Sequence, residues 1–444
     1  MTITLSDITS CFEGVYPSII ATRSADGMPN ISYLSHILPV DLERIAISNQ
    51  FFAKTAANIR SDPHVTFLVV DPQSGQQYQL LATWESSSDH GSVFDSIAMQ
   101  LKVSSAQAGL SDVMRLRTIE LFKVNEIVTV GAPRLARTQA KVKPDITMVA
   151  AVTHQLADLS DSGEIVAKLL DAVLSVFEFR HAMILLSDES RGVLAAADAI
   201  GYNQNLVGAE VPLSVGLIGQ AAASGSTLRI NDLSRMRRMG GAITETSPED
   251  PFTREVTLPG LADAMSQIAI PLNVSSAIQG VLFVESEERF AFDNAVTSGL
   301  EILARHAAVL LALNELLADG TAELPSRRAL ATTDTSDLSI DAVYHNFDHS
   351  IFIARRYVIK GVAARILLHM LQRGLAASDF EFTNRELRAS LSNVLPEFKD
   401  NLETRLLLLR RRLDELELPL RLLRTGRGKL LLEIRGRLNL VVED

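Results

Sequence analysis

The sequence predicts an α+β protein built from several domains, and three observations support this prediction. A chain of 444 residues is too long for one hydrophobic core and suggests about three domains. Short apolar strands alternate with glycine and proline turns through residues 1–135, whereas residues 145–317 combine strands with long helical repeats. Residues 318–338 lack periodicity and are predicted to be a flexible linker. Residues 339–444 return to short strands and helices.

The composition is that of a globular chain, with 47% hydrophobic and 21% charged residues. Its single cysteine, Cys11, excludes a disulfide framework within the chain and a metal site built on several thiolates. We find no apolar run of membrane-spanning length and no basic segment followed by a hydrophobic one at the N-terminus. We therefore expect a cytoplasmic protein that makes no contact with a membrane.

The net charge of −11 is unevenly distributed. Residues 341–444 contain 18 Lys and Arg against 14 Asp and Glu, a balance of +4, which leaves −15 for residues 1–340. An acidic body with a basic terminal domain is expected when only that domain meets a polyanion.

The first 135 residues are predicted to form an antiparallel barrel. The segment PSIIATRSADGMPNISYLSHILPVDLERIAISNQ alternates strands with turns, and the short helix FAKTAANIRSDP stops at Pro63. Two strands, HVTFLVVDP and QYQLLATWESS, follow. A helix around Phe94–Leu101 then precedes the last strand, RTIELFKVNEIVTV.

This order resembles the split barrel of the pyridoxamine 5'-phosphate oxidase family, a flavin-binding fold. The segments ATRSADGMPNISYLS, IAISNQFFAKTAANIRSDPHVTFLVVD and IELFKVNEI carry the resemblance. It implies that the helix start after ISNQ holds the phosphate of FMN, where unpaired N–H groups and the positive end of the helix dipole attract an anion. The implied phosphate contacts are Ser48, Lys54, Thr55 and Asn58, with Tyr33, His36 and Gln77 near the flavin ring.

Two alternatives stay open for the barrel. Lys54 could be a solvated lysine and Thr55 an ordinary helix cap, and split barrels also hold heme or deazaflavin or bind nothing. Barrels of this family pair face to face, so the resemblance implies a homodimer whether or not a flavin is bound.

Residues 207–232, VGAEVPLSVGLIGQAAASGSTLRIND, predict a strand, a short helix between Gly216 and Gly225, and a second strand. Two more strands lie in MSQIAIPLNVSSAIQGVLFVES, and a long helix follows with Asp293 as its N-cap. Residues 145–317 therefore resemble a GAF domain. The resemblance implies an α/β/α sandwich with an antiparallel sheet, a ligand cavity on one face and dimer-forming helices on the other.

Absent motifs narrow the ligand of this second domain. It has no cysteine between Pro144 and Ala318, which excludes the thioether attachment of a bilin. We find no match to the Asn-Lys-Phe-Asp-Glu set of cyclic-nucleotide binders, so the expected ligand is an unidentified small molecule. The polar insertion at residues 235–265 is either a lid over the cavity or a packing loop.

The last domain is predicted to contain a strand pair (SIFIARRYVI), three helices and a hairpin. The helices lie in GVAARILLHMLQRGL, in FTNRELRAS with a capping box at Thr383 or Asn384, and in LPEFKDNLETRLLLLRRRLDELE with Pro396 in its first turn. The hairpin RLLRTGRGKLLLEI turns at Gly426–Gly428.

LETRLLLLRRRLDE followed by LRLLRTGRGKLLLEI resembles the recognition helix and wing of the winged-helix output domain of response-regulator transcription factors. The implied DNA contacts are Lys399, Asn401, Arg405, Arg411 and Arg412 on the helix and Arg427 and Lys429 on the wing. Acidic residues interleave with these cations, and winged helices also dock proteins, so a protein partner stays an alternative to DNA.

The sequence as a whole suggests a one-component sensory regulator, in which a small ligand or the redox state of a flavin controls transcription through the winged helix. The alternatives are a flavin-dependent oxidoreductase with regulatory appendages and a protein-docking adaptor. No nucleophile stands with a base and an orienting group at a recognisable spacing, so no catalytic or metal-binding residue is predicted.

Overall fold

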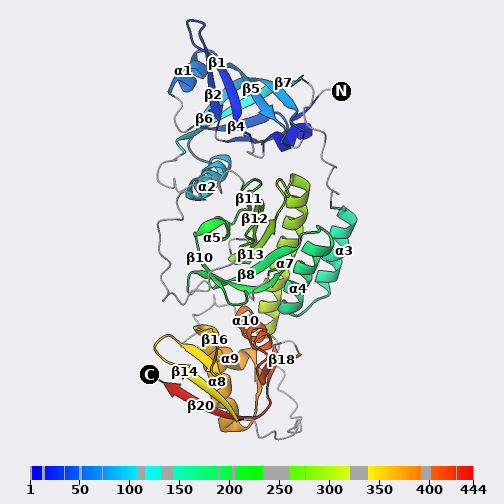
Figure 1. Ribbon diagram of the computed structural model, residues 1–444, viewed down its shortest axis with the longest axis vertical. Helices are drawn as coiled ribbons and strands as arrows, with labels where there is room; N and C mark the ends of the chain where they lie inside the picture. Colours follow the sequence, from blue (N-terminus) through cyan, green and yellow to red (C-terminus); the bar gives the residue numbers. More distant parts are fainter. Residues whose placement is uncertain are drawn as a thin grey trace.

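In the computed structural model, three domains follow one another along the long axis of the molecule in chain order (Figure 1). We call them the barrel domain (residues 3–131), the central domain (144–320) and the C-terminal domain (339–443). The structure describes residues 3–12, 16–34, 36–49, 53–72, 74–107, 116–131, 144–188, 191–202, 206–233, 260–275, 277–320, 339–391, 402–426 and 428–443.

The barrel domain is a curled antiparallel sheet of seven strands in the order β2-β1-β5-β6-β7-β4-β3. Alternate side chains point inward, and Phe67 meets Phe122 edge to face with ring centroids 5.0 Å apart. The strands are β1 (Ser18–Arg23), β2 (Pro29–Leu34), β3 (Ile37–Pro39), β4 (Arg44–Asn49), β5 (His64–Val70), β6 (Gln77–Ser88) and β7 (Thr118–Val130).

Three helices accompany the barrel: η1 (Leu5–Phe12), α1 (Ala53–Ser61) and α2 (Ser92–Gln107). Cys11 lies on η1 and is buried among apolar side chains. Helix α2 lies against α5 (Gly216–Ser224) of the central domain, so the barrel touches that domain through a helix (Figure 1).

The central domain has an antiparallel sheet of six strands in the order β10-β9-β8-β13-β12-β11. Its strands are β8 (His181–Asp188), β9 (Val193–Ile200), β10 (Glu210–Pro212), β11 (Leu228–Ile230), β12 (Ser266–Val274) and β13 (Ala277–Ser286). Ala182, Ile184 and Leu186 pack on one face with α3 (Ile146–Ala157), α4 (Ser162–Ser175) and α7 (Asn294–Gly320), whereas Met183 and Leu185 pack with α5 on the other. The sheet therefore has two separate cores.

Helix α7 begins at the expected cap, because the Asp293 carboxylate accepts a hydrogen bond from Val296 N at 2.8 Å. Contrary to the sequence-based expectation, its segment Asn294–Leu317 is long and apolar enough to span a membrane, with a mean hydropathy of 1.4. In this structure the apolar side chains of α7 form part of the protein core, because Leu300, Leu303 and Ala307 are buried in the central domain.

The C-terminal domain combines two sheets with three helices. Its first and last strands, β14 (Ser339–His345) and β20 (Arg437–Glu443), pair in parallel, which the sequence did not reveal. The other elements are β15 (Ser350–Ile353), β16 (Arg356–Lys360), α8 (Val362–Ala377), β17 (Glu381–Thr383), α9 (Asn384–Ser390), α10 (Leu402–Glu415), β18 (Leu420–Gly426) and β19 (Lys429–Ile434). The predicted capping box is confirmed between Thr383 and Glu386.

Helix α10 is buried on two sides. Leu406, Leu409 and Leu413 belong to the core of the C-terminal domain, whereas Leu407 and Leu408 belong to the helix-side core of the central domain. The turn of α10 at residues 406–409 is apolar all around the helix and must be covered on all sides, and these two domains cover it together.

The close approach of the paired strands β13 and β8 at Gly280 generates a first prediction. A Cβ atom at Gly280 would lie 2.2 Å from the backbone oxygen of Leu185, so alanine cannot fit without moving a central strand. We expect Gly280→Ala to lower the unfolding free energy of the central domain by about 1–3 kcal/mol, the usual range for overpacking, as measured by thermal or urea unfolding.

Gly260→Ala is the matched control, because its added Cβ would meet only the Glu285 carboxylate at an ordinary 3.5 Å. Equal unfolding midpoints for the two variants would contradict the packing argument.

Candidate functional site

A polar cluster lies between the sheet and the first turns of α1 in the barrel domain. The hydroxyl of Thr55 lies 2.9 Å from Ser32 Oγ and accepts a hydrogen bond from Asn30 Nδ2 at 3.2 Å. One turn on, Asn58 Nδ2 donates to Thr22 Oγ1 at 3.0 Å. The structure therefore brings the predicted Thr55 and Asn58 together and adds Thr22, Asn30 and Ser32, which sequence reasoning missed.

His36 and Ser48 form a second predicted pair in the barrel. His36 N donates to Ser48 Oγ at 3.2 Å, and Ser48 N donates to the His36 carbonyl at 3.1 Å. The Nδ1 atom of His36 is buried and has no hydrogen-bond partner among the residues that the structure describes. Burial lowers the pKa of His36 to about 4, because the charged imidazolium would lose its hydration.

The remaining predicted flavin contacts lie apart from the cluster. Lys54 is exposed at the start of α1. Tyr33 is 71% exposed, because neighbouring residues on a strand point to opposite faces and Ser32 points to the cluster. Gln77 of β6 pairs with Val70 of β5. Thr66, which pairs with Ala21 at the cluster end of β1, lies four residues or about 13 Å from Val70 along β5, so Gln77 is distant from the cluster.

The sheet face under α5, where a ligand cavity was expected, is filled by apolar side chains in the part of the chain that the structure describes. At its edge lies the buried carboxylate of Glu285, which accepts hydrogen bonds from Tyr202 Oη at 2.8 Å, Gln267 Nε2 at 2.7 Å and Leu261 N at 3.0 Å. Most of the insertion at 235–265 lies outside the described residues.

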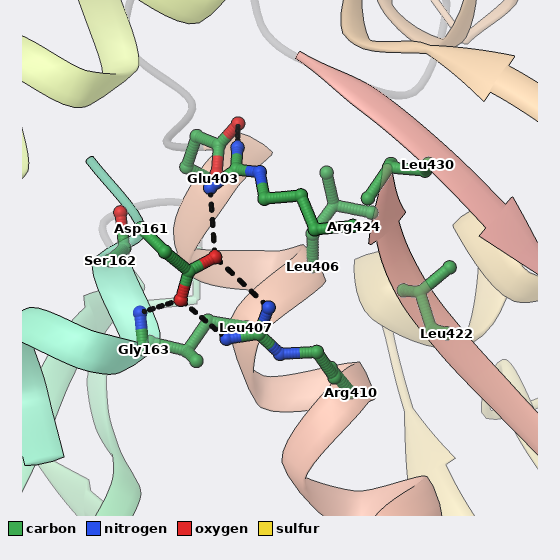
Figure 2. A pocket seen from close by; sticks show the side chains of 10 residues that line it. All are labelled: Asp161, Ser162, Gly163, Glu403, Leu406, Leu407, Arg410, Leu422, Arg424 and Leu430. Atoms are coloured by element: carbon green, nitrogen blue, oxygen red, sulfur yellow. Dashed lines mark hydrogen bonds and ion pairs between the residues drawn. The ribbon is translucent and has the colours of Figure 1, made fainter. Parts of the chain in front are cut away.

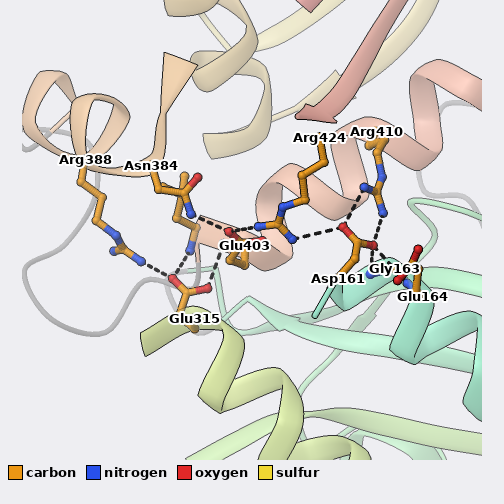
Figure 3. A network of polar contacts seen from close by, with 10 residues as sticks. Asp161, Gly163, Glu164, Glu315, Asn384, Arg388, Glu403, Arg410 and Arg424 are labelled. Carbon is orange, nitrogen blue, oxygen red and sulfur yellow. Dashed lines mark hydrogen bonds and ion pairs between the residues drawn. The ribbon is translucent and has the colours of Figure 1, made fainter. Parts of the chain in front are cut away.

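The most extensive polar network joins α10 and its neighbours to the central domain (Figure 3). The carboxylate of Asp161, the N-cap of α4, accepts hydrogen bonds from Arg410 Nη2 at 2.7 Å and from Arg424 Nη1 at 3.1 Å. Glu315 near the end of α7 accepts the backbone N–H groups of Leu402 and Glu403 at 3.1 and 2.9 Å. Its carboxylate thus caps the N-terminus of α10 from another domain.

Asp161 shows the electrostatic strength of this junction. Burial alone would raise its pKa, but the hydrogen bond and charge of Arg410 and the charge of Arg424 outweigh burial and hold the pKa well below its usual range. Figure 2 shows Asp161 between the two guanidinium groups, with Leu406 and Leu407 beside them. The space left there is about 10 Å³, room for about one water molecule.

Two further ion pairs extend the junction. Arg405, 4% exposed, makes a bidentate pair with Asp188 at the end of β8. Arg411 lies 2.8 Å from Asp198 on β9. Arg405, Arg410, Arg411 and Arg424 are thus each matched by a carboxylate on β8, on β9 or at the N-cap of α4.

The predicted DNA contacts are distributed differently from the sequence-based interpretation. Arg405 and Arg411 engage the central domain, and Arg412 donates to the carbonyl of Val358 at 2.9 Å and pairs with Glu415 at 2.6 Å. Lys429 is partly exposed at the start of β19. Lys399, Asn401 and Arg427 lie outside the described residues. The structure does not support DNA binding through the face of α10 that these arginines occupy.

Among the described residues, no group of three or more His, Cys, Asp or Glu side chains is placed to hold a metal ion.

The buried His36 makes the stability of the barrel domain depend on pH. The unfolded chain takes up this proton near pH 6.5 but the folded barrel only near pH 4, so acidification within that window favours unfolding. We expect the barrel to lose about 2 kcal/mol between about pH 7 and pH 5, and His36→Asn to remove that loss, as measured by urea unfolding. If the stability of His36→Asn depends on pH as strongly as that of the original protein, another group is responsible. His64→Asn, which changes an exposed side chain, is the control and should keep the pH dependence.

Comparisons with known proteins assign two of the three domains. Residues 7–128 match the pyridoxamine 5'-phosphate oxidase family, and residues 160–312 match the GAF domain family. No curated protein matches.

Similar solved structures include the GAF domain of an Acinetobacter phosphoenolpyruvate-protein phosphotransferase (18% identity, 39% of this chain and 95% of that chain, TM-score 0.33). An FMN-binding protein of Syntrophomonas wolfei (19%, 29% and 88%, 0.26) and the free methionine-R-sulfoxide reductase of Neisseria meningitidis (21%, 37% and 85%, 0.29) are others. Neither family match extends past residue 312, so the C-terminal domain is unassigned. The chain joins a split barrel of the pyridoxamine 5'-phosphate oxidase type to a GAF domain.

Proposed function

We propose that this protein is a small-ligand sensor in which the state of the barrel and central domains controls how firmly the C-terminal domain is docked. The observation that carries the proposal is the double burial of α10, with Leu407 and Leu408 in the core of one domain and Leu406 and Leu409 in the core of the other. A helix in this position transmits a change in one domain directly to the next.

Charge supports the same proposal. Three arginines of α10, Arg405, Arg410 and Arg411, meet carboxylates of the central domain. Removing one member of the buried pair of Arg405 and Asp188 leaves the other charge unpaired and costs about 3–5 kcal/mol, whereas the partly exposed pairs of Arg410 and Arg411 contribute less. A few such contacts are enough to decide between a docked and a released C-terminal domain, because a shift from 1:99 to 99:1 needs only about 5.5 kcal/mol.

We propose FMN as the ligand of the barrel. The hydroxyls of Ser32 and Thr55 and the amides of Asn30 and Asn58 form a polar set that would bind a phosphate group, and Lys54, exposed at the start of α1, would supply a positive charge. FMN would supply a redox-active flavin, and these residues would bind and orient its phosphate. The unpartnered Nδ1 atom of His36 is a further polar group that a bound ligand would satisfy.

We propose that the C-terminal domain is the output module and that DNA is its partner. Its helices α9 and α10 followed by the β18–β19 hairpin support this interpretation. Arg405 and Arg411 would be available to phosphates only after release from Asp188 and Asp198, so the carboxylates of the central domain and a nucleic acid would compete for the same side chains.

We infer that two copies pair through α3 and α7. These helices keep large apolar side chains exposed on their outer side, among them Ile146 and Leu316, which are 65% and 72% exposed. A paired apolar face of this kind would remove that surface from water.

Weakening the junction tests the sensor proposal. Asp161→Asn removes the charge facing Arg410 and Arg424 but keeps an oxygen that can cap α4. We expect a loss of about 2 kcal/mol at the junction and hydrogen exchange in α10 about 30-fold faster, as measured by mass spectrometry on the full chain.

Asp171→Asn is the matched control, because Asp171 is exposed and pairs with Lys168 of the same helix. Unchanged exchange in α10 would refute the docking proposal. Faster exchange without stronger, salt-sensitive retention of Asp161→Asn on duplex DNA would instead exclude DNA as the partner.

Reconstitution with FMN tests the proposed cofactor. We expect the protein to bind FMN with a flavin absorbance band, and Thr55→Val together with Lys54→Met to weaken binding by about 10–100-fold, through loss of one charge-assisted and one neutral hydrogen bond. Arg23→Met, which breaks a surface pair with Asp62, is the control.

Failure of the original protein to bind FMN in equilibrium dialysis would contradict the proposal. Binding accompanied by oxidation of a reduced nicotinamide cofactor would identify an oxidoreductase instead of a sensor.

A further inference from the structure

A cavity of about 110 Å³ lies between the central and C-terminal domains, apart from the α1 cluster of the barrel. One wall comes from β8–β10 of the central domain and carries Asp188, Arg191 and Glu210; the other comes from β16 and α10 and carries Lys360, Arg405 and Arg412. The two domains therefore contribute equally to its charged lining.

The cavity has more cations than anions. Four basic side chains, Arg191, Lys360, Arg405 and Arg412, line it against the two carboxylates of Asp188 and Glu210. Glu415 partly balances Arg412 from outside the lining. An excess of positive charge in a confined, partly desolvated space is costly, and a bound anion offsets that cost.

The carboxylates are already shared. Both nitrogens of the Arg191 fork contact Glu210, at 2.5 and 2.7 Å, and Lys360 Nζ lies 3.8 Å from the same carboxylate. Asp188 faces Arg405 and, at 3.9 Å, Arg191. Each of the two carboxylates thus serves two cations, and among the described residues Lys360 lies only at the limit of an ion pair.

The lining also offers contacts for the uncharged part of a ligand. Val207, Val358, Ile359 and Leu408 provide apolar surface, and the Tyr357 hydroxyl provides a hydrogen-bonding group. Burial, with the charge of Glu210, raises the pKa of Tyr357 to about 12, so the hydroxyl stays protonated and can donate at neutral pH. A water molecule needs about 10–15 Å³ of such space, so the cavity has room for an organic anion of several non-hydrogen atoms.

We propose that this cavity, the junction cavity, binds a small organic anion carrying a carboxylate or a phosphate group, which contacts Lys360 and Arg412 from one domain and Arg191 from the other. The inference rests on the proposed sensor function and names a ligand class and a place for it. Because both walls are needed, the anion binds the docked state more tightly and stabilises it.

Two anions test the proposal on the full chain by isothermal titration calorimetry: inorganic phosphate and succinate. We expect at least one of them to bind, and Lys360→Glu to weaken that binding by more than 10-fold because it reverses the charge least engaged in pairing. Lys360→Gln should weaken it several-fold and guards against misfolding of the reversal variant. Lys168→Glu, at a distant surface pair, should leave binding unchanged.

The outcomes separate the possibilities. Binding of phosphate alone or of succinate alone identifies the anionic group, and both results support the site. Absence of binding for both anions, or binding that is unaffected by both Lys360 variants, overturns the proposal.

Hydrogen exchange distinguishes a failure of the anion-site proposal from a failure of the sensor proposal. Faster exchange in α10 of Asp161→Asn than of the original protein, without any anion, supports docking by itself, whatever the calorimetry gives. The bound anion should slow exchange in α10 further, and faster exchange on binding would overturn the proposed stabilisation of the docked state.

Discussion

The burial of α10 between two hydrophobic cores is the constraint on which the C-terminal half of the molecule depends. Its leucines pack into the cores of the central and the C-terminal domain at once, which fixes the position of the helix. The arginines of the same helix are therefore held at the domain contact and need carboxylates there to pair with. Asp161, Asp188 and Asp198 supply these carboxylates, and Glu315 caps the start of the helix. Part of the charge asymmetry between the acidic body and the basic tail domain therefore lies in this one internal contact.

Local sequence signals predicted the elements well. The Asp293 cap and the Thr383–Glu386 box depend on residues three positions apart, and the structure confirms both. The position of α10 depends on partners far away in the chain, such as Asp161 and Arg410, which are 249 residues apart. One sequence signal was available: four consecutive leucines, 406–409, are apolar all around one turn of the helix and leave that turn no face for water or for DNA.

The barrel site shows the same limit on a smaller scale. Thr55 and Asn58 were singled out because the family resemblance names them at the helix start, and the structure places both in the polar cluster. Their partners Asn30 and Ser32 alternate along β2, a pattern that equally describes a solvated strand face, and only the packing of α1 over that face distinguishes the two. The distance of Gln77 from these residues follows from strand register, which cannot be read from composition, so its place near the flavin ring stays a prediction.

The parallel pairing of β14 with β20 has a consequence for biosynthesis. The first strand of the C-terminal domain meets its partner only across the whole length of that domain, from Ser339 to Arg437. During translation, the barrel and central domains can fold while this strand still lacks its neighbour, because domains generally fold as units in the order of their synthesis. The four-stranded sheet is completed last, once residue 443 has left the ribosome, and until then one edge of β14 is open to incorrect strand pairing.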